Sequence, residues 1–288
     1  MFSPTNTDFI FTSETTPAVS TNLKQSVDMV LPLVGVADAV NVTDSPNSKT
    51  RLSSLLVAAG IKELGLDVIL QLTGRDRNRI AIESEVLGAL SLGINKVLCL
   101  TGDKPSEGGP QVVNEFDSAG IMGLLNVMST GKLADGTEIK EPLPIYPGAA
   151  DDLYFQKENP QAIDFLKRKI TNGAKFIQTQ YCFDEDICQF YSDLLIANGK
   201  TDDLKILVGM GPLKSAKQAL WMRENLWGVN ISDAIISRLD ASKNPKKEGL
   251  MICQELISKL IDLPGIDGVH LMGPSCESDA ADIIKLFR

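Results

Sequence analysis

Two carboxylates of this sequence follow short apolar runs, a position where a side chain could do chemistry. Glu14 follows the run that starts at Phe9, and Asp103 follows the run that ends at Thr101. A carboxylic acid in a partly apolar setting can act as a general acid with a raised pKa, or as an anion that tunes a cofactor. For each carboxylate taken alone, a helix cap or a surface ion pair is the structural alternative.

Three glutamines, Gln71, Gln178 and Gln180, stand inside runs that are otherwise apolar. A buried amide without a hydrogen-bond partner costs about 1–3 kcal/mol. These amides therefore indicate either a ligand or an internal polar network. For any one of them, a glutamine satisfied inside the fold is an equally good interpretation.

Arginines alternate with polar residues in the stretch Arg75–Arg79, which reads RDRNR. Arg75, Arg77 and Arg79, which cluster around Asp76 and Asn78, could bind a phosphate or a carboxylate through their guanidinium groups in a forked geometry. The start of a helix with internal ion pairs explains the same residues, and the sequence leaves both interpretations open. His270 lies in an apolar run and is interpreted as a core histidine.

The counts of histidine and cysteine exclude several classes of enzyme. With one histidine and no CxxC pair, a zinc site is improbable, and so is a Ser-His-Asp or Cys-His catalytic group, so no metal site is expected. The odd number of cysteines indicates reduced thiols in a cytoplasmic protein. These cysteines are Cys99, Cys182, Cys188, Cys253 and Cys276.

Length and charge set further limits. The 288 residues predict one domain, residues 1–288, because a barrel of eight βα units usually needs about 250 residues. A net charge of −9 disfavours nucleic acid and anionic lipid as partners. No apolar run reaches the roughly 18 residues of a membrane span, and the N-terminus lacks the pattern of a secretory signal.

Eight short β-rich runs alternate with longer amphipathic stretches that could be helices. Each link is long enough for a crossover helix, and nearly continuous apolar strands are typical of a parallel sheet covered on both sides. The expected strands are Phe9–Ser13, Ala39–Thr43, Val68–Thr73, Lys96–Thr101, Leu143–Tyr146, Phe176–Gln180, Ile206–Met210 and Gly268–Met272. The expected helices include Lys49–Glu63, Arg79–Leu92, Pro160–Thr171, Asp186–Asn198 and Lys247–Ile261.

Eight such units predict a (βα)8, or TIM, barrel, whose chemistry lies at the carboxyl ends of the strands. A doubly wound open sheet is the main alternative, but the sequence has neither a GxGxxG nor a GxxxxGK[ST] turn. Ser129–Pro142 contains Asp135-Gly136 and predicts an excursion, with a small hairpin as one form. Residues Gly211–Asn244 predict more than one helix.

Longer motifs resemble a known family. VNVTDSPNSKTRLSS, LQLTGRDRNRIAIESEVLGALSLGINKVLCLTGDKP and LKRKITNGAKFIQTQYCFD are similar to methylenetetrahydrofolate reductases, above all to a bacterial and archaeal branch marked by the RDRN turn. The resemblance runs from Ser13-Glu14 to Val269-His270-Leu271. LTGD, NGAKFIQTQ and the following FD are specific in combination.

The resemblance implies a barrel that binds FAD and reduces 5,10-methylenetetrahydrofolate to 5-methyltetrahydrofolate with NADH or NADPH. It implies that Glu14 is the general acid while the methylene bridge opens, that Asp103 adjusts both flavin and pterin, and that Gln180 binds the pterin. Gln218 matches a folate-contacting glutamine. The implied cofactor contacts are Thr43, Gln71, Arg75, Asn78, Thr101, Gly102, Asp103, Ser118, Tyr146 and Lys169. Relatives commonly self-associate, so a homo-oligomer is expected.

The sequence also departs from the family pattern. Gln71 stands where many relatives carry a flavin-facing histidine, and Phe165 stands where the residue is often polar and also faces the flavin. Gly74 replaces a small thiol residue, Gly148–Asp151 lacks another histidine, and Trp221-Met222 stand where an aromatic often stacks on substrate. The alternatives are therefore a flavin-free homologue that uses NAD(P)H directly and a methyl-transfer subunit that is inactive alone. An unrelated barrel lyase would need a lysine at the end of a strand, and none of the eight strand ends carries one in a clear position.

Overall fold

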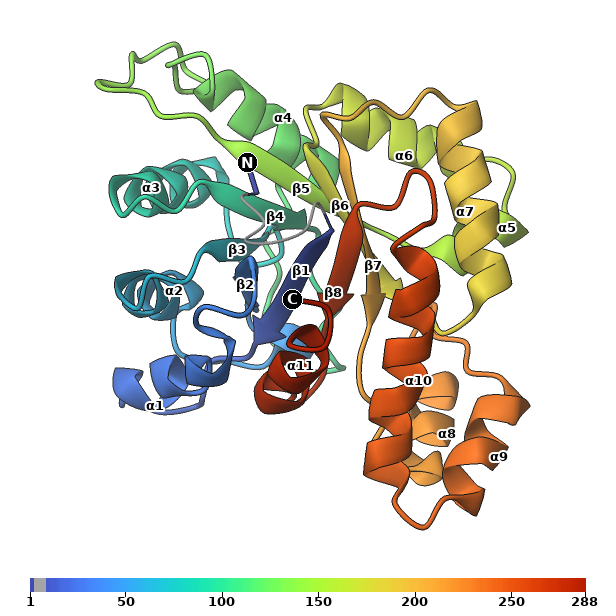
Figure 1. The fold of residues 1–288 in the computed structure, drawn as a ribbon. Coiled ribbons are helices and arrows are strands. Elements are labelled where there is room, and N and C mark those ends of the chain that lie inside the picture. The colour runs from blue at the N-terminus through green and yellow to red at the C-terminus, as the bar shows by residue number, and fades with distance from the viewer. Residues whose placement is uncertain (3–8) are drawn as a thin grey trace.

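The computed structural model describes residues 1–2 and 9–288. Eight parallel strands close into one barrel in the order β1 to β8, with β8 paired to β1. The α/β-barrel fold expected from the alternation of elements is therefore confirmed (Figure 1). The strands are β1 (Ile10–Thr15), β2 (Ala39–Val42), β3 (Val68–Thr73), β4 (Lys96–Leu100), β5 (Tyr146–Asp151), β6 (Phe176–Tyr181), β7 (Lys205–Met210) and β8 (Gly268–Leu271).

Helices surround the barrel, and α8, α9 and α10 gather beside its β7 side (Figure 1). The stretch between β7 and β8 thus holds more than one helix, as expected. The α-helices are α1 (Leu23–Asp28), α2 (Ser54–Glu63), α3 (Arg79–Ser91), α4 (Ser118–Met128), α5 (Leu153–Glu158), α6 (Ala162–Thr171), α7 (Glu185–Ala197), α8 (Ala216–Asn225), α9 (Asp233–Ala241), α10 (Pro245–Leu260) and α11 (Glu277–Ile284). Two short 3-10 turns are η1 (Leu31–Leu33) and η2 (Pro46–Ser48).

The barrel interior is layered. Ala39, Ile69, Leu98 and Phe176 form an apolar cluster that lies apart from the main core between barrel and helices. Alternate residues of a strand face the same side, so the residues two positions further along occupy the next layer of the interior. Asn41, Gln71 and Gln178 stand at three of these four positions, and Leu100 stands at the fourth. An apolar layer therefore supports a polar layer nearer to the carboxyl ends of the strands.

The fifth strand differs from the prediction. Leu143–Tyr146 has the more β-like composition, but the strand is Tyr146–Asp151, YPGAAD. Small residues are needed there because the Phe176 ring fills the space: a Cβ on Gly148 would lie 2.2 Å from the Phe176 ring. The prediction was wrong because packing against β6 outweighed local β propensity.

Smaller features follow the expectations. An isolated antiparallel bridge joins Lys132 to Glu138, and Gly136 has a φ of 89°, so the excursion before β5 contains a small hairpin. The described residues contain no helix that is both long enough and apolar enough to cross a membrane.

Candidate active site

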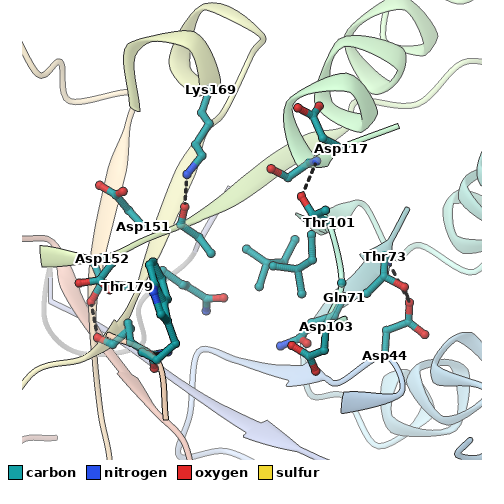
Figure 2. Close-up of a pocket in the computed structure, with 18 of the residues that line it drawn as sticks. Asp44, Gln71, Thr73, Thr101, Asp103, Asp117, Asp151, Asp152, Lys169 and Thr179 are labelled. Atoms are coloured by element: carbon teal, nitrogen blue, oxygen red, sulfur yellow. Dashed lines mark hydrogen bonds between the residues drawn. The ribbon is translucent and has the colours of Figure 1, made fainter. Parts of the chain in front are cut away.

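A pocket of about 750 Å³ opens at the carboxyl ends of the strands. Figure 2 shows its two walls: Asp44, Thr73, Thr101 and Asp103 on one side, and Asp151, Asp152, Lys169 and Thr179 on the other. The first wall comes from β2, β3 and β4 with the residues after them, and the second from β5, β6 and α6. Side chains far apart in sequence thus face one space.

Most of the residues expected at a site line this pocket. They are Glu14, Thr43, Gln71, Arg75, Thr101, Gly102, Asp103, Ser118, Lys169 and Gln180. The closed barrel brings them together because all the strands are parallel and end at the same rim.

Three expected residues lie outside the pocket lining. Tyr146 begins β5, pairs with Lys96 and therefore stands at the opposite end of the barrel. Asn78 caps α3, its side chain accepting a hydrogen bond from the Ala81 amide. Gln218 accepts a hydrogen bond from the Lys214 backbone at 2.7 Å and so closes the turn into α8.

Glu14 is a partly buried acid near the end of β1, with 19% of its side chain exposed. Its Oε1 accepts one hydrogen bond, from the Gly273 backbone at 3.2 Å. Burial raises the pKa of Glu14 to about 7, the Gly273 contact lowers it, and the nearby Glu277 raises it further. A carboxyl group with this pKa can hold a proton near neutral pH and release it to a ligand in the pocket.

His270 faces Glu14, which sequence reasoning did not anticipate. Its Nδ1 lies 3.2 Å from Gln178 Nε2 and 2.9 Å from Thr12 Oγ1. Since an amide nitrogen can only donate, Nδ1 accepts and Nε2 carries the proton. Nε2 lies 4.0 Å from Glu14 Oε2. Burial lowers the pKa of His270 to about 3, so the pair is not an ion pair near neutral pH: the titrating proton sits on Glu14.

Gln178 is satisfied within the polar layer and Gln71 is not. Gln178 Oε1 accepts from Asn41 Nδ2 at 2.6 Å, and its Nε2 donates towards Asn41 Oδ1 at 3.0 Å and His270. The internal-network interpretation therefore fits Gln178. Gln71 is only 9% exposed, lines the pocket and makes no side-chain hydrogen bond to a described residue. Its amide is available to a ligand.

Asp103 sits beside a turn with unusual backbone angles. Its Oδ2 accepts a hydrogen bond from the Asn47 amide, and its carbonyl accepts one from Ser48 Oγ at 2.7 Å. Ser45, Asn47 and Ser48 all have positive φ, between 47° and 56°. Such angles are uncommon outside glycine and concentrate where a structure must hold a special geometry. The turn fixes the side of the pocket that carries Asp103.

The arginine-rich turn is built from ion pairs. Arg75 pairs with Asp76 and also donates to the Ser45 carbonyl at 3.3 Å. Arg77 pairs with Asp44 at 2.6 Å and with Glu85 at 2.7 Å. The helix-start interpretation therefore describes this turn. Arg75 lines the pocket, but its guanidinium is largely engaged within the protein.

Cationic groups on α6 face the second wall. Lys169 Nζ donates to the Ala150 carbonyl at 2.7 Å, and Arg168 lies 3.4 Å from Asp117. Ser118 begins α4, and its backbone donates to Thr101 Oγ1 at 3.2 Å. A helix N-terminus together with two cations can hold phosphate oxygens.

The β5 end adds two carboxylates that sequence reasoning missed because it placed this strand too early. Asp151 accepts from Tyr191 Oη at 2.7 Å, and burial raises the pKa of Asp151 although Lys169 opposes the shift. Asp152 caps α5 through Oδ1, while its buried Oδ2 has no hydrogen-bond partner among the described residues. Correct strand limits would have revealed both. Within the described chain, no group of three His, Cys, Asp or Glu side chains could hold a metal ion.

A closed parallel barrel with a partly buried acid in a pocket at its carboxyl rim defines a (βα)8-barrel enzyme site. The model of the family described as methylenetetrahydrofolate reductase matches residues 4–287, and the chain belongs to that family. The resemblance seen in the sequence motifs is thereby confirmed at the level of the family.

Two relatives carry related names. "Methylenetetrahydrofolate reductase 2" of Saccharomyces cerevisiae is 26% identical over 243 residues, which cover 82% of this chain and 39% of that protein. "5,10-methylenetetrahydrofolate reductase" of Pectobacterium carotovorum subsp. carotovorum is 25% identical over 271 residues, covering 92% of this chain and 84% of that one. The chain therefore spans well under half of the yeast relative.

A solved structure shares the fold. It is an uncharacterized protein from Clostridium thermocellum described as binding two copies of 5-methyl-5,6,7,8-tetrahydrofolic acid. Its TM-score is 0.68 at 12% identity, and the match covers 96% of each chain. At this identity the likeness shows the fold alone.

Proposed function

We propose that this protein interconverts 5,10-methylenetetrahydrofolate and 5-methyltetrahydrofolate by hydride transfer, with NADH or NADPH as the electron source and FAD as the carrier. The observation that carries the proposal is Glu14, a partly buried acid in the pocket at the rim of the barrel, whose pKa is raised to about 7. Membership of the family supplies the substrate class.

Glu14 acts by moving one proton. In the reducing direction, its carboxyl donates a proton to the amine nitrogen that leaves the methylene carbon as the bridge opens. The resulting iminium carbon then accepts a hydride and becomes the methyl group. His270 stays neutral: its Nε2 lies 4.0 Å from Glu14 Oε2, beyond hydrogen-bond distance, and Gln178 fixes the histidine tautomer. His270 thus packs beside the acid without adding a positive charge.

The residues present fit a flavin dinucleotide. The unpartnered amide of Gln71 offers hydrogen bonds to a ring edge. Lys169 and Arg168, which Asp117 holds beside the start of α4, offer cations for phosphates. FAD would supply the redox chemistry between nicotinamide and folate, and Gln71, Arg168 and Lys169 are among the residues that would hold it. The remaining work falls to the protein: it holds the two rings in one pocket and keeps bulk water away from them.

The substrate assignment has two further supports. The pocket, at about 750 Å³, has room for a folate beside a second ring system. The Clostridium thermocellum protein with the same fold is described as binding two copies of 5-methyltetrahydrofolic acid. Both observations agree with a folate site and with a neighbouring site for a planar group.

The absorption spectrum of the purified protein, combined with turnover, is the deciding experiment. Flavin absorption bands together with NADH- or NADPH-dependent reduction of methylenetetrahydrofolate support the full proposal. A colourless protein that still oxidises NAD(P)H with this folate removes FAD and leaves a direct hydride transfer. A protein that binds no tetrahydrofolate overturns the proposal.

A methyl-transfer subunit that is inactive alone is the second candidate, since the chain spans only 39% of the yeast relative. Turnover of the isolated chain with an artificial electron donor separates it from a self-sufficient reductase. Methyl oxidation by the chain alone favours the reductase. No turnover with any donor, together with measurable folate binding, favours the subunit.

We also propose that residues 1–288 form one catalytic domain that self-associates in the cytoplasm, without nucleic acid or a membrane as partner. The five free, buried cysteines agree with a reducing compartment. Light scattering of the purified chain measures its oligomeric state, and a strictly monomeric chain would remove the self-association.

A further inference from the structure

The segment between α8 and α9 places an indole at the mouth of the pocket. Trp227 lines the pocket, and yet 72% of the residue is exposed. A large apolar side chain in this condition leaves apolar surface in water, which disfavours the free state and favours contact with a ligand.

The backbone around Trp227 is held firmly. Its carbonyl accepts a hydrogen bond from Gln180 Nε2 at 3.0 Å, and Asn230 forms a bridge with Cys182. Gly228 has a φ of +73°, and a Cβ there would lie 1.9 Å from Asp152 Oδ2. Only glycine permits this close approach, so the peptide after Trp227 lies directly on the end of β5.

The side chain itself is only partly packed. The Phe155 ring centroid lies 6.1 Å from that of Trp227, and Phe165, which is 54% exposed, lies 6.4 Å from Phe155. The three rings form an aromatic wall that runs along one side of the pocket. A fixed backbone with an open aromatic face is preorganised for stacking, because little conformational entropy is lost when a planar ring binds.

We propose that Trp227 is a substrate-positioning residue whose indole stacks on an aromatic ring of the bound folate. The inference rests on the proposed function, since it names the residue that orients the same substrate. The folate is the expected partner because the Trp227 carbonyl accepts its hydrogen bond from Gln180, the residue that the family resemblance assigns to the pterin.

The tryptophan content of the chain makes a direct test possible. Its two tryptophans are Trp221 and Trp227, and Trp221 lies on α8 outside the pocket lining. In Trp221→Phe the remaining indole should be quenched when 5-methyltetrahydrofolate is added to the holoprotein. In Trp227→Phe the quenching should disappear, while the dissociation constant from equilibrium dialysis stays within about threefold of the wild-type value.

Removing the ring measures its contribution. Trp227→Ala should raise the dissociation constant for 5-methyltetrahydrofolate about tenfold and raise KM more than it lowers kcat, because ring stacking is lost. NADH binding should change little. Gly228→Ala is a second variant: its Cβ displaces the loop from Asp152, so folate binding should weaken although the indole is retained. Circular dichroism and thermal melts check that both variants fold.

The outcomes separate the inference from the proposed function. Wild-type binding of 5-methyltetrahydrofolate with unchanged affinity in Trp227→Ala would overturn the role of Trp227 and leave the proposed function standing. Weaker NADH binding with normal folate binding would assign the indole to the dinucleotide and overturn the inference as well. A wild-type protein that binds no folate removes both.

Discussion

At the scale of single residues, the barrel solves the problem of keeping a carboxylic acid protonated near neutral pH. Glu14 receives one backbone hydrogen bond and faces a neutral imidazole, so little compensates its carboxylate for lost hydration. A cationic histidine at the same place would stabilise the carboxylate and lower the pKa of Glu14. Burial of His270 prevents this, because its own pKa falls to about 3.

The folate half-reaction should therefore depend on pH through Glu14. The acid must carry its proton to assist opening of the methylene bridge, so the rate of folate reduction should fall tenfold per pH unit above about pH 7. Below that pH, down to the range where the protein unfolds, no histidine limb should appear. Stopped-flow rates across pH 5.5–9 give the profile, and a rate that rises through pH 7–9 would argue against an acid role.

Glu14→Gln should lower the rate of folate reduction about 10²–10⁴-fold, while the nicotinamide still reduces bound flavin. The amide preserves size and polarity but has no proton to give. Each half-reaction is followed separately by flavin absorbance. Loss of both together would mean that Glu14 supports the site generally and is not a specific acid.

Asp103→Asn should alter both half-reactions, because Asp103 lies at the pocket wall that the flavin and pterin are expected to share. The substitution keeps an acceptor for the Asn47 amide, so the neighbouring turn should stay intact. Kinetics identical to those of the wild type in both halves would place Asp103 outside the site.

At the scale of elements, the buried carboxylate of Asp44 in the first wall links the ends of β2 and β3 and, through Arg77, connects them to α3. Asp44 Oδ2 accepts from the Thr73 amide at 2.9 Å and from Arg77 at 2.6 Å. Arg77 also donates a hydrogen bond to Glu85 on α3. Burial lowers the pKa of Arg77, but Glu85 and Asp44 raise it above its usual value. These contacts fix the end of β2 against β3 and thereby hold the turn that carries Asp103's partner, Asn47.

Arg77→Ala should destabilise the fold by about 3 kcal/mol, because it leaves the buried Asp44 carboxylate without its cation. Chemical denaturation measures the change in free energy of unfolding. Arg223→Ala is a matched control, because Arg223 pairs with Asp233, which is almost fully exposed. This substitution should lower the free energy of unfolding by no more than about 1 kcal/mol. Equal losses in the two variants would contradict the structural role of the Asp44 pair.

At the scale of the whole molecule, the pocket lies between strands from opposite parts of the barrel (Figure 2). A ligand that touches both walls bridges segments that separate only when the barrel opens. Binding should therefore stabilise the folded chain as a unit and should not merely order one loop.

A saturating folate should raise the melting temperature of the protein. At 5-methyltetrahydrofolate concentrations 100 times the dissociation constant, the expected stabilisation is about 2.7 kcal/mol. Differential scanning calorimetry with a folate titration measures it. A titration in which the ligand binds but the melting temperature does not move would mean that the site forms in only part of the barrel.

The class of fold and much of the rim follow from the amino-acid sequence. Eight apolar runs separated by crossover lengths specify a parallel barrel, since the alternation is local and survives errors at the ends of strands. Glu14, Gln71 and Thr101, which lie in or directly after well-defined strands, line the pocket for the same reason.

The tertiary structure alone decided the rest. The small residues of β5 pack against the ring of Phe176, and the strand therefore begins at Tyr146. Tyr146 consequently lies at the opposite end of the barrel from the pocket, and Asp152, which the sequence analysis did not name, lies at the rim. The side-chain hydrogen bonds of the two buried glutamines also depend on the tertiary structure. Gln178 bonds to His270, more than 90 positions away, and Gln71 bonds to no described residue. The protonation of Glu14 likewise depends on burial and on an imidazole supplied by the last strand, because pKa values respond to distance in space and not in sequence.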